Sequence, residues 1–164
     1  MKDAKIVLGI VAVSLAILVG GLLLVSRNSK TPSIVASQAA KTKVEETTFS
    51  WGTISMKDGK VDKTFTITNI GSETLQLANV ITSCMCTEAQ VEIEGQKSPY
   101  FGMHQNSSWL GEIPAGKEAK LIVTFDPAFH GPQGTGQITR LVSLETNDQS
   151  QPKIEFTLSA NVTN

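Results

Sequence analysis

The stretch that decides the fold class is Val61-Asp62-Lys63-Thr64-Phe65-Thr66-Ile67-Thr68-Asn69, along which apolar and polar side chains alternate. In an extended chain this alternation puts Phe65 and Ile67 on one face, as in a β-strand that buries one side. Turn residues lie before the stretch, at Lys57-Asp58-Gly59, and after it, at Ile70-Gly71-Ser72-Glu73. We therefore predict a strand over residues 61–69 that is bounded by two turns.

Segments on both sides repeat this pattern, and turn residues separate them. Together with the first, the predicted strands are residues 47–54, 61–69, 75–82, 84–93, 119–125, 138–145 and 154–162. A set of about seven short strands with no soluble helix is typical of an immunoglobulin-like (Ig-like) β-sandwich. We therefore expect an all-β domain of this kind over residues 46–164.

Two stretches inside the predicted domain have no period. Residues 94–112 mix Gly, Pro, Met, His, Asn, Ser and Trp, and residues 126–136 are rich in glycine and proline. Long irregular stretches often carry function, and we interpret residues 94–112 as an insertion. Its aromatic residues fit either a local hydrophobic cap or an exposed binding patch. These residues are Tyr100, Phe101 and Trp109.

The N-terminal part of the chain differs sharply from the rest. Residues 6–25 contain only Ile, Val, Leu, Gly, Ala and one Ser. A helix of this length would be about 30 Å long, which matches the hydrocarbon thickness of a bilayer. We predict one transmembrane helix over residues 6–25, with the lipid bilayer as its partner. Residues 1–5 would be a short cytoplasmic tail, and residues 26–45 a flexible tether rich in Ser, Ala, Lys and Thr.

Charge alone does not decide the orientation of this helix, because Lys2 and Lys5 precede it while Arg27 and Lys30 follow it. A cleaved signal peptide is the main alternative, but the apolar region of such a peptide usually has about 7 to 15 residues. We expect an uncleaved anchor in the cell membrane, with the domain on the extracytoplasmic side. The net charge of −1 over 164 residues gives no bias toward nucleic acid, so we expect no nucleic-acid partner.

Several short motifs carry a resemblance to a known family. They are Phe49-Ser50-Trp51-Gly52-Thr53-Ile54, Phe65-Thr66-Ile67-Thr68-Asn69, Ser83-Cys84-Met85-Cys86-Thr87, Ile113-Pro114-Ala115-Gly116, Val123-Thr124-Phe125-Asp126 and Thr146-Asn147-Asp148. Over residues 49–162 the chain resembles the bacterial family called domain of unknown function 1573. The resemblance implies a sandwich similar to the Ig-like domains of the SPD-2 and Hydin group, exported or membrane-attached, with no established activity. The family commonly has Gly where Met85 stands, and it is usually shorter over residues 88–112.

The candidate metal ligands form one sequence motif and two loop positions. The chain's two cysteines form Cys84-Met85-Cys86, and its two histidines, His104 and His130, fall in the two irregular stretches. Sulfur with imidazole suits copper(I) first and zinc second. The loop with His130 is predicted at the same end of the sandwich as the cysteines, so His130 is favoured over His104. Met103 is a further candidate ligand, through its thioether sulfur.

The cysteines also permit two other interpretations. If residues 84–86 are extended, both sulfurs point to one face and Met85 points into the core, with the two Cα atoms about 6.6 Å apart. That separation is near the upper limit for a disulfide, so a bridge would need a local bend. Structural thiols are the third interpretation, although an exported location favours oxidation. A metal site, a disulfide and inert thiols therefore all stay open.

No catalytic motif is present, because no Ser lies in a strand-to-helix nucleophile turn and the glycine-rich residues 131–136 precede a strand. We expect a non-enzymatic Ig-like interaction module, anchored in the membrane, that binds an extracytoplasmic protein. The alternative is a copper-binding or thiol-redox protein that uses Cys84 and Cys86 with loop His or Met residues.

Overall fold

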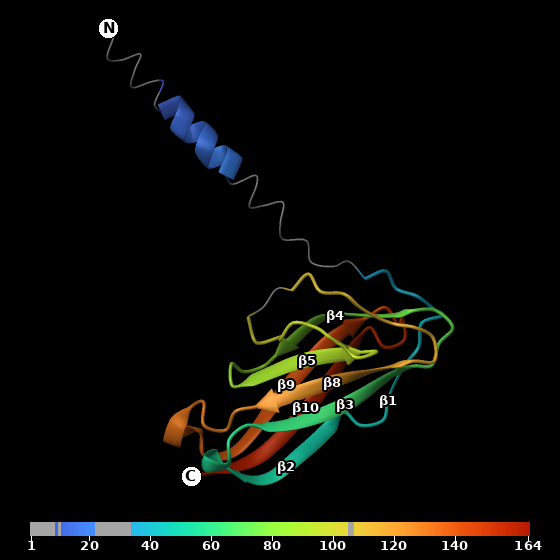
Figure 1. Cartoon of the computed structure of the whole chain (residues 1–164), viewed down its shortest axis with the longest axis vertical. Coiled ribbons are helices and arrows are strands. Elements are labelled where there is room, and N and C mark those ends of the chain that lie inside the picture. Colours follow the sequence, from blue (N-terminus) through green and yellow to red (C-terminus); the bar gives the residue numbers. More distant parts are fainter. Residues whose placement is uncertain (1–8, 10, 22–33, 105–106) are drawn as a thin grey trace. The chain divides into compact units, whose positions relative to one another are not determined.

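The structure is a computed structural model that describes residues 9, 11–21, 34–104 and 107–164. The chain divides into two units, residues 1–31 and residues 32–164. In the first unit, residues 9 and 11–21 are helical (Figure 1). In the second, the chain forms two β-sheets.

The predicted membrane helix over residues 6–25 lies partly outside the described residues, and the predicted tail over residues 1–5 lies wholly outside them. Within the part of the chain that is described, no helix combines the length and the apolar character needed to cross a bilayer. The membrane anchor therefore stays a prediction from the sequence.

Two five-stranded sheets make up the second unit (Figure 1). The first sheet has the order β1 (Thr42–Val44), β3 (Val61–Asn69), β8 (Glu118–Phe125), β5 (Thr87–Ile93) and β6 (Gln96–Lys97). The second has the order β2 (Thr48–Ser55), β10 (Lys153–Thr163), β9 (Gly136–Thr146), β4 (Leu75–Thr82) and β7 (Gly111–Ile113). Two short 3₁₀ helices complete it, η1 (Met56–Asp58) and η2 (Gly131–Gly134). Neighbouring strands are antiparallel except β2 and β10, which are parallel.

The core lies between the two sheets, as the alternation in the sequence predicts. Phe65 of β3 and Phe156 of β10 come from different sheets, are both buried, and have ring centroids 4.7 Å apart. Each such side chain contributes about 1.5–3 kcal/mol through the apolar surface that it removes from water. The two-sheet, Ig-like architecture predicted from the sequence is confirmed, and each of the seven predicted strands has a counterpart.

The prediction of a tether over residues 26–45 is wrong for its described part, and the domain begins before residue 46. Strand β1 pairs with β3, and Ala40 is completely buried in the main core. Asp148, whose side chain is 2 % exposed, accepts hydrogen bonds from the backbone N–H of Thr42 and from the Lys41 ammonium. These contacts join residues distant in sequence, so a search for local periodicity misses them. Residues 26–33 lie outside the described part.

The predicted insertion, residues 94–112, contains regular structure in its described part, residues 94–104 and 107–112. Glu94 and Gly95 both have positive φ, at 49° and 81°, and form the two-residue turn between β5 and β6. Phe101 forms an antiparallel β-bridge with Ala89 of β5 and is buried. The Trp109 ring packs against the Phe101 ring, with the ring centroids 5.3 Å apart. The cap interpretation therefore holds for these two aromatic residues.

Candidate functional site

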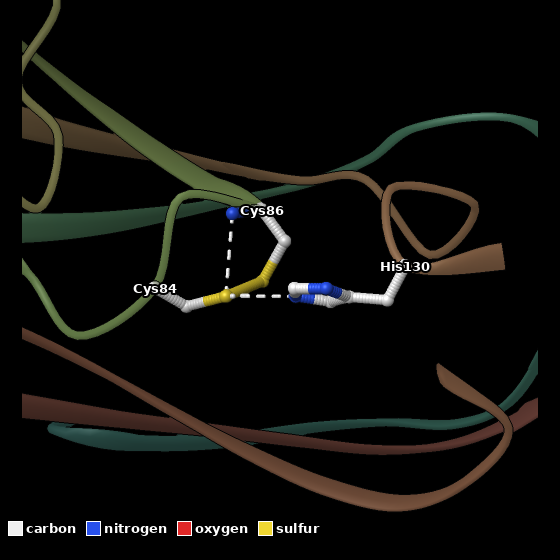
Figure 2. A group of neighbouring side chains, drawn as sticks. All are labelled: Cys84, Cys86 and His130. Atoms are coloured by element: carbon white, nitrogen blue, oxygen red, sulfur yellow. Dashed lines mark hydrogen bonds between the residues drawn. A yellow bond between two sulfur atoms is a disulfide. The ribbon is translucent and has the colours of Figure 1, made fainter. Parts of the chain in front are cut away.

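The cysteine motif lies in the tight turn between β4 and β5, and not in an extended strand. The backbone N–H of Thr87 donates to the carbonyl of Cys84, and the Thr82 hydroxyl lies within hydrogen-bonding distance of that carbonyl and of the Thr87 carbonyl. This bend brings the Cα atoms of Cys84 and Cys86 to 5.2 Å, and the two sulfurs form a disulfide (Figure 2). Of the three interpretations of the cysteines, the structure shows the disulfide. A core position for Met85 was expected only for an extended segment, and the turn instead leaves its side chain 61 % exposed.

The two cysteines differ in their surroundings. Cys86 is 2 % exposed and packs in a small cluster with Phe125, Ala160 and Val162, whereas Cys84 is half-buried at the edge of that cluster. The sulfur of Cys84 accepts a hydrogen bond from the backbone N–H of Cys86, at 3.2 Å. Solvent and partner molecules therefore reach Cys84 more readily than Cys86.

His130 reaches the disulfide from the loop between β8 and β9. The backbone N–H of Asp126 donates to the Cys86 carbonyl, which joins the start of this loop to the cysteine turn. The His130 imidazole is exposed, and its Nε2 lies 3.4 Å from the Cys84 sulfur (Figure 2). The two cysteine sulfurs and a ring nitrogen of His130 all lie within 4.8 Å of one another.

His104 is not part of this group. It is exposed in the insertion, and the three-residue group of His, Cys, Asp and Glu atoms found among the described residues does not include it. Met103 is half-buried, and its place as a ligand stays a prediction. Metal binding at Cys84, Cys86 and His130 stays a prediction, because thiolates and not disulfide sulfurs are metal ligands.

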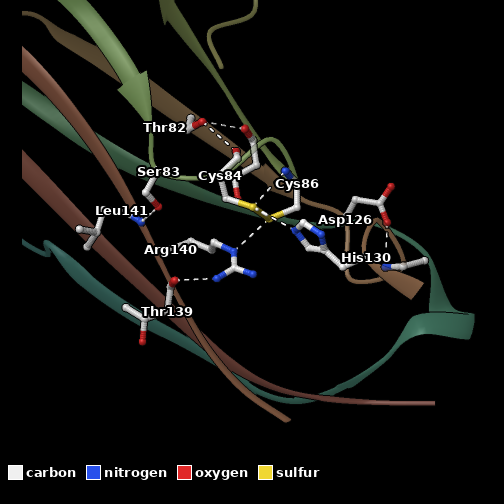
Figure 3. The surroundings of a disulfide bond; sticks show 11 residues. Thr82, Ser83, Cys84, Cys86, Asp126, His130, Thr139, Arg140 and Leu141 are labelled. Carbon is white, nitrogen blue, oxygen red and sulfur yellow. Dashed lines mark hydrogen bonds between the residues drawn. A yellow bond between two sulfur atoms is a disulfide. The ribbon is translucent and has the colours of Figure 1, made fainter. Parts of the chain in front are cut away.

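Arg140 is a site residue that the sequence reasoning missed. It lies on β9, and its Nε donates to the Cys86 sulfur at 3.0 Å, while Nη1 donates to the Thr139 carbonyl (Figure 3). The guanidinium carbon also lies 5.5 Å from the centroid of the Phe125 ring. Burial lowers the pKa of Arg140 from its ordinary value, but a guanidinium stays protonated at neutral pH.

Two hydrogen bonds fix Arg140 relative to the cysteine turn. The backbone N–H of Ser83 donates to the Leu141 carbonyl, and the Leu141 N–H donates back to the Ser83 hydroxyl, both at 2.9 Å (Figure 3). A signal for this residue was present in the sequence. Arg140 occupies an inward position of an alternating strand, in register with Ile138 and Val142, where a charge is unusual.

A shallow pocket of about 190 Å³ opens beside the disulfide. Its lining residues are Lys60, Met85, Cys86, Glu88, Thr124, Asp126 and Phe129. Two of them, Met85 and Phe129, are large apolar side chains that are 61 % and 48 % exposed. Exposed apolar side chains beside a pocket are typical of a binding surface.

The fold is similar to those of known structures at low sequence identity. A crystal structure of a protein of unknown function from Porphyromonas gingivalis W83 has a TM-score of 0.58 and 20% identity, with 79% of this chain and 50% of that chain covered. This chain therefore spans about half the length of that protein, and the likeness shows the fold alone.

Two further structures are similar at lower scores. The ASH / PapD-like domain 7 of human CEP192 has a TM-score of 0.49 and 12% identity, over 82% of this chain and 94% of that chain. The YadV chaperone has a TM-score of 0.48 and 9% identity, over 75% and 52% of the two chains. No curated protein matches this chain in sequence. A family model does match, and it confirms the resemblance seen in the sequence: residues 42–99 match the model of the family described as protein of unknown function (DUF1573).

Proposed function

We propose that this chain is a non-enzymatic Ig-like binding module, displayed on the extracytoplasmic side of the cell membrane by residues 6–25. Its binding surface is the cysteine end, which we define as the turn 83–86 together with the loop 126–136. The observation that carries the proposal is the exposed apolar pair Met85 and Phe129 beside the pocket at this end. The closed disulfide supports the location, because disulfides persist in oxidising compartments.

The sheet edges favour binding through these loops over binding by strand addition. Strands β1, β6 and β7, which lie at three of the four sheet edges, have only two or three residues. The fourth edge, β2, has eight residues, but its register shifts opposite Ser159 and Asn161, and Gly52 has a φ of 71°. Short and bulged edges are devices that discourage pairing with another chain.

A photocrosslinking amino acid at position 85 or 129, in the full-length chain on intact bacterial cells, tests the binding surface. Ile70 is the matched control, because it is 60 % exposed, apolar and in the turn at the opposite end of β4. We expect one discrete protein adduct from positions 85 and 129 and none from position 70. Equal labelling from position 70 would contradict the proposed surface.

The location needs its own test. We expect the chain to sediment with membranes, and protease added to spheroplasts, which lack an outer barrier, should degrade residues 34–164 if the domain is extracytoplasmic. Protection in spheroplasts, followed by digestion after lysis, would contradict the extracytoplasmic location.

Copper(I) binding by the reduced chain is a second candidate function. It is favoured by one observation, the two sulfurs and the His130 nitrogen within 4.8 Å. Soft sulfur and imidazole ligands suit copper(I), and zinc would be the second choice. Titration of the reduced, anaerobic full-length chain should give one copper(I) per chain. Binding should disappear in the double variant Cys84→Ser/Cys86→Ser and weaken in His130→Ala but not in His104→Ala, whereas a wild-type chain without binding would end this candidate.

A further inference from the structure

Hydrogen-bond donors surround both sulfurs of the disulfide. The Cys84 sulfur faces the backbone N–H of Cys86 at 3.2 Å and His130 Nε2 at 3.4 Å. The Cys86 sulfur faces Arg140 Nε at 3.0 Å and the Thr87 hydroxyl at 3.7 Å. A neutral disulfide sulfur accepts hydrogen bonds only weakly, whereas an ionised acceptor forms bonds about twice as strong. These donors would therefore stabilise thiolates better than they stabilise the bridge.

The charge of Arg140 has no anionic partner. It is half-buried, and none of the ion pairs among the described residues includes it. Burying an unpaired charge costs free energy that a nearby opposite charge offsets. The nearest group to Arg140 Nε that can become an anion is the Cys86 sulfur. If the disulfide opens and its electron pair stays on Cys86, the resulting thiolate forms an ion pair with the Arg140 guanidinium.

Exposure makes the two sulfurs unequal as targets. Cys84 is half-buried, whereas Cys86 is 2 % exposed. An attacking thiolate therefore meets Cys84 first, and Cys86 is the leaving group. The greater exposure of Cys84 and the Arg140-stabilised leaving group act in the same direction, because thiol–disulfide exchange is faster when the leaving thiolate is more stable.

We propose that the Cys84–Cys86 disulfide oxidises a pair of cysteine thiols in a protein bound at the cysteine end. This inference rests on the proposed function, since the partner must first bind beside Met85 and Phe129. In the first step a partner thiolate bonds to the Cys84 sulfur, the bond between Cys84 and Cys86 breaks, and its electron pair stays on Cys86 beside Arg140. The product of this step is a mixed disulfide on Cys84.

In the second step the partner's other thiolate attacks the partner sulfur of the mixed disulfide. The bond to Cys84 breaks, and its electron pair stays on the Cys84 sulfur, which faces the Cys86 N–H and His130. The partner dithiol is thereby oxidised to a disulfide by loss of two electrons, and Cys84 and Cys86 are reduced to thiols that take up the two protons. The exchange is stoichiometric, with one partner disulfide formed for each chain.

The test mixes the oxidised full-length chain, in detergent, with a synthetic peptide that carries two reduced cysteines between apolar residues. After acid quenching and alkylation, mass spectrometry should show a peptide lighter by two hydrogens and a chain with two alkylated cysteines. A single-cysteine version of the peptide should give a mixed disulfide on Cys84. A mixed disulfide on Cys86, or exchange no faster than that of the peptide with glutathione disulfide, would overturn the inference.

Variants test the role of Arg140. Arg140→Gln should slow the exchange on the order of tenfold, because the Cys86 leaving group loses its cation. Arg140→Lys should recover part of the rate, which a merely structural role would not predict. Lys153→Gln is the matched control, because Lys153 is an exposed cation on β10, in the same sheet as Arg140, and lies outside the cysteine end. An Arg140→Gln chain that exchanges at the wild-type rate would refute this assignment.

A serine version of the peptide separates this inference from the proposed function. Its binding to the chain can be followed by fluorescence anisotropy, with Met85→Ser expected to weaken binding and Ile70→Ser expected to leave it unchanged. If the serine peptide binds but the cysteine peptide is not oxidised, the redox inference fails and the binding module stands. If neither happens, both fail.

Discussion

Replacing Asp148 with asparagine should remove stability in a way that depends on pH. Burial on its own would raise the pKa of the Asp148 carboxyl, but hydrogen bonds from Ser150, Thr42 and Lys41 outweigh it and lower the pKa from 3.8 to about 2. The four donor groups of these three residues lie 2.6–3.3 Å from the carboxylate oxygens. The donors from Lys41 and Thr42 join the start of β1 to the turn between β9 and β10, so these two hydrogen bonds form only in the folded chain.

The sign and size of the effect follow from these values. Because the pKa is lower in the folded chain, the ionised carboxylate stabilises the fold above the unfolded pKa, and this contribution disappears as the pH falls through about 2. A lowering from 3.8 to about 2 corresponds to about 2 kcal/mol at pH 7. At pH 3 the carboxylate is partly protonated in the unfolded chain, so the contribution falls to roughly half.

Urea unfolding of the full-length chain in detergent, followed by tryptophan fluorescence at pH 7, 5 and 3, measures this difference. Asp148→Asn should be less stable than the wild type by about 2 kcal/mol at pH 7 and 5, and by about 1 kcal/mol at pH 3. Ser150→Ala removes only one side-chain donor and should cost about 1 kcal/mol. A free-energy difference that is the same at all three pH values would show that Asp148 acts by packing and not by charge.

Three further substitutions test the packing. Gly71→Ala should lower the free energy of unfolding by about 1–3 kcal/mol, because a Cβ would overlap the backbone of Ala39; unchanged urea stability would mean that the segment before β1 is not packed there. Phe101→Ala should cost about 3–5 kcal/mol and expose Trp109, which a red-shifted fluorescence spectrum would report; an unshifted spectrum would argue against the cap. Asn69→Ala should cost about 2–3 kcal/mol in thermal unfolding, since its buried amide donates to two backbone carbonyls, and a smaller loss would mean that water replaces the amide.

The strands could be predicted from the sequence because alternation directly reports which face of a strand is buried. Residues 61–69 and 75–82 were predicted with their observed bounds. Strands β1, β6 and β7 have two or three residues, which is too short for an alternation to show. Strand β5 begins at Thr87 and not at Cys84, because hydrogen bonds from Thr82 and Thr87 turn the chain between them.

The same reasoning from the sequence predicts only part of the site. Counting strands puts the turn 83–86 and the loop 126–136 at one end of the sandwich, and His130 does lie beside the cysteines. The bridge itself could not be predicted, because an extended chain would hold the two Cα atoms about 6.6 Å apart, whereas the turn brings them to 5.2 Å. Arg140 is not a type of metal ligand, and its one signal in the sequence is a cation at an inward position of an alternating strand.

The reactivity proposed for the disulfide depends on sheet order more than on the cysteine motif. Cys84 and Cys86 are supplied by one turn, but the donor to Cys86 comes from β9, which lies beside β4 only because the second sheet has formed. His130 depends in turn on the hydrogen bond between Asp126 and Cys86, which joins the end of β8 to the start of β5 in the first sheet. Both sheets must therefore be complete before the two sulfurs differ in exposure and in the charged group beside them. A related chain with the same two cysteines, but with an apolar residue in place of Arg140, should keep the bridge and lose its preference for releasing Cys86.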